Sequence, residues 1–268
     1  MRRIVTCLFF LMLLSSLTFA QQKLPEGAMS GDFQLSLTCR LYRVNCPQPK
    51  IVVPVEIYAT STLVNRYGEM ELENIMRDSL SAFYIQNGVD FTAEVKNGKW
   101  ITPILQDGEE FTSQVAKSIP RKKNTLVILL SHKRFQDNPE LAARGLTYGG
   151  INGASWFAVW IDPFRYKIDP RRQIVHELGH EFGLWDSNDG ASVMCTAKNT
   201  VTGERQTCST SSVYFSGSEL TKISSVINVM KKISFDTYTR LMLGNDSYEV
   251  YDVNVVLKDS ATGNELKK

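Results

Sequence analysis

Hydrophobic residues recur along this chain at two spacings, which predict alternating strands and helices. Runs of alternating or continuous apolar residues are typical of strands, and the continuous run over 125–130 is typical of a strand covered on both faces. Apolar residues three or four positions apart predict helices. The expected strands are 33–44, 51–59, 89–95, 125–130 and 154–161, and the expected helices are 69–86, 171–182 and 218–233.

Turn-forming residues mark the ends of two of these helices. Asn87-Gly88 is expected to stop the first helix, because glycine readily adopts the left-handed conformation that ends one. Asp169-Pro170 is a good cap and first-turn pair, and it is expected to open the second helix.

The order of elements predicts the domain organisation. Pro54 is expected to break its strand early, and 146–153 is a glycine-rich segment before the last strand. The succession of strands and helices predicts one α/β domain with a mixed twisted sheet over 21–233. Residues 234–268 are expected to form a separate strand-and-loop extension.

The first twenty residues, 1–20, are typical of a secretory signal that is removed. Arg2 and Arg3 precede an apolar run over 4–14, and a Thr-Phe-Ala end follows. The run is too short to span a bilayer comfortably, with a membrane anchor as the alternative. Removal lowers Lys+Arg from 30 to 28, against 28 Asp+Glu, so the mature charge is about zero. We expect a secreted or periplasmic protein without a membrane span, and no electrostatic reason for nucleic-acid binding.

Four cysteines remain after the signal: Cys39, Cys46, Cys195 and Cys208. An even number in an exported protein predicts two disulfides, with three possible pairings. The local pairing, Cys39–Cys46 and Cys195–Cys208, is favoured because each pair brackets a short turn-like stretch. A cysteine-based metal site is the alternative, but the spacings fit a zinc knuckle poorly.

The run His176-Glu177-Leu178-Gly179-His180 lies inside the second long predicted helix. Residues four apart share a helical face, so both imidazoles can point at one metal ion. Zn²⁺ accepts neutral imidazole nitrogen, and Glu177 is placed to act as a general base toward water. The alternative is a chance HExxH on an amphipathic helix.

The residues after this run extend the pattern. Gly183 falls where the helix should end, so the chain can turn back toward the ion and bring Asp186. Ser192-Val193-Met194 follows after a further short loop. Together these residues resemble the signature of the metzincin zinc proteases, with a spacing to Met194 typical of matrix metalloproteinases.

The resemblance implies a metzincin fold, with an active-site helix, a Met-turn and a C-terminal helix, and a secreted zinc-dependent endopeptidase. It implies that zinc is bound by His176, His180 and Asp186, that Glu177 is the catalytic base, and that Met194 lies in a tight turn beneath the metal.

One ligand departs from the common family pattern. Most metzincins have histidine where this chain has Asp186, and a minority have aspartate. Asp189 and Glu204 are alternative third ligands, although the surroundings of Glu204 lack a second helix. His132 is interpreted as an ordinary residue at a strand end. The resemblance covers roughly residues 50–233.

The strand over 154–161 has an expected role of its own. In metzincins the corresponding edge strand binds the substrate backbone as an added antiparallel strand. The alternative is a core strand, because its residues are mostly apolar. The candidate substrate-binding residues are Ala154, Ser155, Trp156, Phe157 and Ala158.

The segment bracketed by Cys195 and Cys208 predicts a further arrangement. Its polar, basic loop is a target for trypsin-like proteases, and a disulfide would keep the two pieces joined after a cut. This resembles the enzymatic subunit of cholera-like A–B-pentamer toxins, of which a metzincin version of the Ecx type exists. The resemblance implies a pentameric binding subunit that docks the extension over 234–268.

Two other readings stay open. In the first, the chain would be a stand-alone secreted protease with a stabilised surface loop. In the second, it would be a metzincin-fold protein that binds zinc or a partner without turnover. The presence of Glu177 argues against the second, because a non-catalytic fold has no need of the base.

Overall fold

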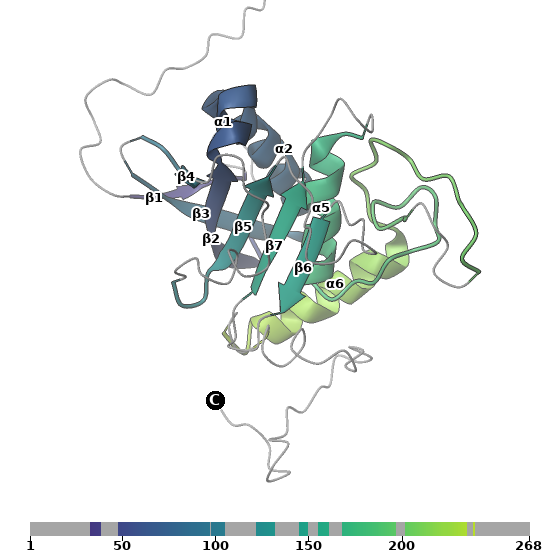
Figure 1. Cartoon of the computed structure of the whole chain (residues 1–268). Helices are drawn as coiled ribbons and strands as arrows, with labels where there is room; N and C mark the ends of the chain where they lie inside the picture. The colour runs from purple at the N-terminus through teal and green to yellow at the C-terminus, as the bar shows by residue number, and fades with distance from the viewer. Residues whose placement is uncertain are drawn as a thin grey trace, which may run out of the picture. The chain divides into compact units, whose positions relative to one another are not determined.

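A computed structural model of the chain (Figure 1) divides it into two compact units, Met1–Gly31 and Asp32–Lys268. The first unit lies wholly outside the described residues, and so do the predicted signal segment, Cys39 and Cys46. No helix in the described part of the chain is long and apolar enough to cross a membrane. The structure describes residues 33–38, 48–96, 98–104, 122–131, 145–149, 155–160, 168–196, 202–234 and Tyr238.

The second unit is an α/β fold built on a mixed seven-stranded sheet, so the predicted fold class is confirmed at this level. Its strands run in the order β1-β3-β2-β5-β7-β6, and β4 pairs with β2 as well. The pairings of β2 with β3, β4 and β5 and of β5 with β7 are parallel, whereas β1 and β6 are antiparallel to their neighbours. The strands are β1 (Phe33–Ser36), β2 (Ile51–Thr60), β3 (Val89–Val95), β4 (Ile101–Ile104), β5 (Leu126–Ser131), β6 (Gly145–Gly149) and β7 (Ser155–Trp160).

The strand predictions need three corrections. Pro54 does not break β2: it pairs with Thr92 of β3, and the pairing of β2 with β5 begins only at Val55. Proline has no backbone N–H, and this is tolerated at position 54 because β2 has a partner on one side only there. The first strand ends at Ser36, and Leu37 and Thr38 form a bend. Strand β4, and strand β6 in the predicted glycine-rich segment, were not expected from the sequence.

The described helices are α1 (Ser61–Tyr67), α2 (Glu69–Asn87), α5 (Pro170–Glu181) and α6 (Gly217–Met230). Three of them match the helices predicted from apolar spacing, and α1 was not predicted. Helix α2 ends at Gly88, which is in the left-handed conformation with φ 76°, as the Asn87-Gly88 pair predicts. Helix α5 begins as predicted, with Asp169 as its N-cap and Pro170 in its first turn.

Strand β7 contains Ser155, Trp156, Phe157 and Ala158 and is not an edge strand. It pairs with β5 on one side and with β6 on the other, so its backbone groups are already used. The prediction that these residues add a substrate strand is therefore wrong in its placement. Ala154 lies outside the described residues. The edge of the described sheet on this side is β6.

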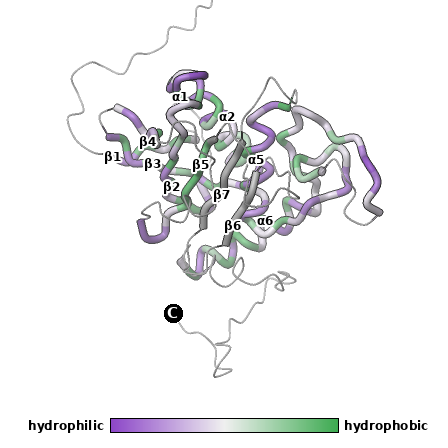
Figure 2. The backbone as a smooth tube through the Cα atoms, viewed as in Figure 1, coloured by the Kyte–Doolittle hydropathy of each residue, from purple (hydrophilic) through white to green (hydrophobic). Residues whose placement is uncertain are grey.

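The core lies between the sheet and the helices packed on one of its faces. Alternate residues of β2, including Val53, Val55 and Ile57, are buried together with the apolar face of α2. Helix α5 packs against α2, β6 and β7. Figure 2 shows hydrophobic residues along β5, and hydrophilic residues on α1 and in the loop between α5 and α6. The core includes Tyr238, which lies beyond the predicted domain boundary at residue 233.

Candidate metal centre

Helix α5 carries both histidines of the HExxH run. Its apolar residues Ile174, Val175 and Leu178 are fully buried in the core and hold the helix against its neighbours. His176 and His180 are one helical turn apart, so their side chains lie on the same side of α5. The ring centroids are 4.7 Å apart, and the rings are nearly perpendicular.

A tight turn after α5 brings the third residue to the histidines. Gly183 has φ +80°, and its N–H donates to the carbonyl of His180 at 2.9 Å. The N–H of Leu184 donates to the carbonyl of Gly179 at 3.0 Å. These two bonds form the Schellman motif that reverses the chain at a helix end. The turn directs Asp186 toward the side of α5 that carries His176.

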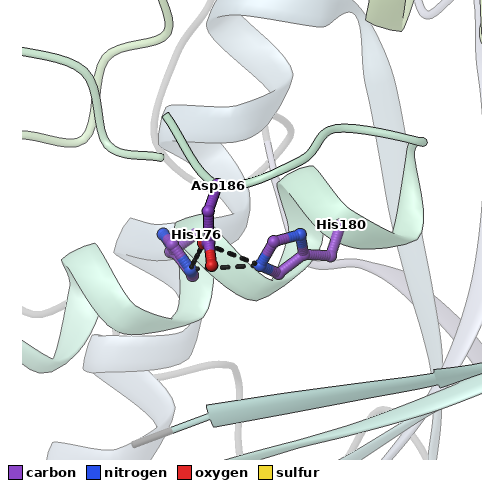
Figure 3. A group of neighbouring side chains, drawn as sticks. All are labelled: His176, His180 and Asp186. Atoms are coloured by element: carbon purple, nitrogen blue, oxygen red, sulfur yellow. Dashed lines mark hydrogen bonds and ion pairs between the residues drawn. The ribbon is translucent and has the colours of Figure 1, made fainter. Parts of the chain in front are cut away.

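The three side chains converge on one point, as Figure 3 shows. The Nε2 atoms of His176 and His180 are 3.1 Å apart, and Oδ1 of Asp186 lies 3.3 Å and 3.5 Å from them. Four ligands arranged tetrahedrally at about 2.0–2.1 Å from a metal ion are about 3.3–3.4 Å from one another. The spacing of these donor atoms fits a small ion at their centre.

The other nitrogen of each imidazole bonds to a backbone carbonyl. Nδ1 of His176 lies 2.9 Å from the carbonyl oxygen of Val193, and Nδ1 of His180 lies 2.8 Å from that of Leu184. A carbonyl only accepts, so each Nδ1 carries the hydrogen and each neutral ring directs an Nε2 lone pair toward the other. Two lone pairs at this distance repel unless a cation or a proton lies between them. The donor set therefore fits a metal ion.

Without an ion, the pKa values of His180 and Asp186 are shifted in opposite directions, as expected for donor atoms that lie close together. Burial lowers the pKa of His180, but the hydrogen bond to Asp186, the charge of Glu177 and the bond to Leu184 outweigh it and raise that pKa to about 9. Burial raises the pKa of Asp186, but its hydrogen bonds to His176 and His180 lower it overall, well below the usual range. Without an ion, a proton on His180 neutralises the negative charge that faces it.

Met194 lies in a turn over residues 192–195, referred to below as the Met194 turn. Its side chain is fully buried and contacts Gly179. The N–H of Cys195 donates to the carbonyl of Ser192 and closes the turn. The N–H of Ser187 donates to the carbonyl of Met194 at 2.8 Å, so the segment that follows Asp186 is attached to the same turn.

Glu177 is 4% exposed and lies on α5 next to His176. It is not one of the three residues whose donor atoms converge, but its charge raises the pKa of His180. Of the alternative third ligands, Asp189 accepts a hydrogen bond from the N–H of Ala191 and Glu204 is exposed on a separate segment. The geometry therefore favours Asp186 as the third donor among the described residues. His132 lies outside the described residues.

The structure contains the predicted disulfide between Cys195 and Cys208, with Cα atoms 5.7 Å apart. It joins the segment 206–209 to the residue that follows Met194. The Gln206 amide donates to the carbonyls of Ser187 and Thr196, at 3.3 Å and 2.7 Å. These two hydrogen bonds, which join the segments of Ser187 and Thr196 beside the candidate metal centre, were not predicted, because sequence spacing alone does not pair Gln206 with either carbonyl.

A second unpredicted feature is the contact of α6 with the Met194 turn. Ser192 donates a hydrogen bond to the carboxylate of Glu219, and both side chains are buried. The pattern Ser216-x-x-Glu219 before an apolar run is the sequence signal of a capping box, and the structure contains that box. The signal identifies the helix start, but it does not indicate the contact with Ser192.

No protein-family model matches this chain. No curated protein matches it either. Among solved structures, the chain is similar to one described as "Structure of a chaperone-substrate complex", with 12% sequence identity and a TM-score of 0.37. The match covers 70% of this chain and 35% of that chain, so this chain spans about a third of its length. At this TM-score the likeness carries no argument about fold or function.

Proposed function

We propose that this chain is a secreted zinc-dependent endopeptidase of the metzincin type. The observation that carries the proposal is the convergence of Nε2 of His176, Nε2 of His180 and Oδ1 of Asp186, with both Nδ1 atoms bonded to carbonyls. Nitrogen and carboxylate donors suit zinc, and three protein ligands leave a fourth position open, as in catalytic zinc sites. The disulfide Cys195–Cys208 supports an oxidising compartment outside the cytoplasm.

The three candidate ligands and Glu177 would have different roles in peptide hydrolysis. His176, His180 and Asp186 would hold the ion. When bound, zinc would supply a Lewis acid that polarises the scissile carbonyl and makes water more acidic. Glu177 then takes a proton from the attacking water on its carboxylate and gives it to the nitrogen of the leaving amine. The Val193 and Leu184 carbonyls keep the ring hydrogens on Nδ1 throughout, which keeps both Nε2 atoms available as ligands.

The sheet topology supports a revised substrate strand. We expect β6 (Gly145–Gly149), rather than β7, to pair with the substrate backbone. It pairs with β7 on one side, no described strand covers its other side, and α5 packs against it. An extended peptide added there gains main-chain hydrogen bonds.

The proposal is tested by cleavage of a diverse peptide library by the mature protein beside Glu177→Ala. Glu204→Ala, which removes an exposed glutamate, is the matched control. We expect the wild type and the control to cleave, and Glu177→Ala to bind zinc without cleaving. A chelator should abolish cleavage and added zinc should restore it. Zinc binding without cleavage by the wild type would overturn catalysis and favour a non-catalytic zinc-binding protein.

The disulfide-bracketed segment supports a second candidate, the enzymatic subunit of an A–B-pentamer toxin. Thr202, Gly203, Glu204 and Arg205 are exposed inside the bracket, where a protease can reach them. On this reading residues 209–268 would dock into a pentameric binding subunit after nicking. Co-purification of that piece with a pentamer encoded nearby would support the candidate, and a nicked protein that assembles with no partner would argue for a stand-alone protease.

A further inference from the structure

Glu219 has more hydrogen bonds than the start of helix α6 requires. It is the third residue of α6 and 7% exposed. Oε2 accepts from the backbone N–H of Ser216 at 2.6 Å, which completes the capping box. The box uses only this one bond from the carboxylate. The same carboxylate also accepts from the Ser192 hydroxyl, whose oxygen lies 2.9 Å from Oε1 and 2.7 Å from Oε2.

Ser192 connects Glu219 to the candidate metal centre through hydrogen bonds. Its hydroxyl has one hydrogen, which it donates to Glu219, and its oxygen accepts from the N–H of Met194 at 3.0 Å. Val193 lies between these two residues, and its carbonyl accepts the Nδ1 hydrogen of His176. Its own N–H donates to the carbonyl of Tyr214 at 2.8 Å. The orientation of the Val193 carbonyl therefore depends on the hydrogen bond on each side of it.

We propose that Glu219 is a positioning residue for the metal centre, acting through the Ser192 hydroxyl to hold the Val193 carbonyl against Nδ1 of His176. The inference rests on the proposed function, because it concerns a ligand of the proposed zinc site. A buried carboxylate is suited to this role, since it only accepts and so fixes the direction of the Ser192 hydrogen. The hydroxyl oxygen is then left to accept from Met194.

Three substitutions separate positioning from helix capping. Ser192→Ala removes the connection and keeps the capping box. Glu219→Gln replaces one acceptor oxygen by an NH₂ group. In either orientation of the amide this donor lies beside the Ser192 hydroxyl oxygen, whereas the remaining oxygen can still accept from the N–H of Ser216. Ser216→Ala is the matched control, because it removes the N-cap side chain that bonds the N–H of Glu219 and leaves the contact with Ser192.

Zinc affinity is measured by competition with a chelator, under conditions where circular dichroism shows each variant to be folded. We expect Ser192→Ala and Glu219→Gln each to weaken zinc binding by about 10–100-fold, the usual effect of losing an outer-shell partner. The double variant should bind zinc no more weakly than the single variant with the lower affinity, because both substitutions break the same connection. Ser216→Ala should lower stability and keep zinc affinity within about twofold of wild type.

A second readout uses the zinc-free protein with ¹⁵N-labelled histidine. The Nδ1–H signal of His176 should exchange slowly in the wild type and Ser216→Ala, and rapidly in Ser192→Ala and Glu219→Gln. Unchanged signals in these two variants, or equal loss of affinity in Ser216→Ala, would overturn the positioning role. A third outcome separates the two proposals. If the wild type binds no zinc, but the Nδ1–H of His176 still exchanges faster in Ser192→Ala and Glu219→Gln than in Ser216→Ala, the proposed function is refuted. The orienting effect of Glu219 on the Val193 carbonyl and His176 would still stand.

Discussion

Gly179 on α5 lies so close to Met194 that a methyl group at position 179 would overlap the Met194 sulfur atom. The same methyl group would lie 3.0 Å from Cε1 of Phe215. Because Gly179 lies between His176 and His180 in the sequence, this contact sets how closely the helix that bears both histidines approaches the Met194 turn. The glycine is required by packing and not by an unusual backbone angle.

We expect Gly179→Ala to lower the free energy of unfolding by on the order of 1 kcal/mol and to weaken zinc binding. Overpacking a filled core costs about 1–3 kcal/mol, and the higher helix propensity of alanine offsets only about 1 kcal/mol. Urea-induced unfolding measures the change. The control is Gly217→Ala at the start of α6, where an added methyl group meets no atom within 4 Å. Equal stability of the two variants would contradict the role of the Gly179–Met194 contact.

The assignment of Asp186 as third donor predicts a contrast between two nearby aspartates. Asp186→Ala should weaken zinc binding by more than the ~10–100-fold that follows loss of an outer-shell partner. Asp189→Ala, which loses only a hydrogen bond within its own loop, should bind zinc within a few-fold of wild type. Chelator competition measures both. If Asp189→Ala proves the weaker binder, the third ligand has been assigned to the wrong residue.

The pKa of His180 predicts how the stability of the zinc-free protein depends on pH. That pKa rises to about 9 on folding, from about 6.5 in an unfolded chain. A raised pKa contributes stability that is fully present below pH 6.5 and is lost as the pH rises through 9. Urea unfolding of zinc-free protein between these values should show the decline. The decline should be absent in His180→Gln and in zinc-loaded protein, and its persistence in His180→Gln would assign it to another group.

The disulfide predicts a stability effect beside the site. Replacing Cys195 and Cys208 by serine should lower the free energy of unfolding by about 2–4 kcal/mol, because their separation of 13 residues in the sequence corresponds to about 3 kcal/mol of loop closure. Zinc affinity should fall as well, since the segment that carries Gln206 is then held only by hydrogen bonds. A reducing agent should reproduce both effects in the wild type, and any effect that it still has on the double variant would belong to the predicted Cys39–Cys46 bond. A reduced wild type of unaltered stability would contradict this estimate.

Much of the candidate site could be read from the sequence because its signals are local. The spacing of His176 and His180 places both on one side of a helix, and Asp169-Pro170 and Gly183 mark the ends of that helix. Such patterns depend on residues within one or two turns of one another, so they hold whatever surrounds them. The same applies to Asn87-Gly88 and to the short bracket between Cys195 and Cys208.

The tertiary structure decided what depends on residues far apart in the chain. Whether β6 or β7 lies at the sheet edge depends on the order of strands, which apolar runs do not encode. Pro54 continues in β2 because of where β5 begins its pairing. The contact between Ser192 and Glu219 spans 27 residues. The sequence by itself determined which chemical groups the centre contains, since these follow from local spacing. Only packing decided which carbonyls and carboxylates hold the groups in position, because a hydrogen bond between distant segments forms only when the whole core brings them together.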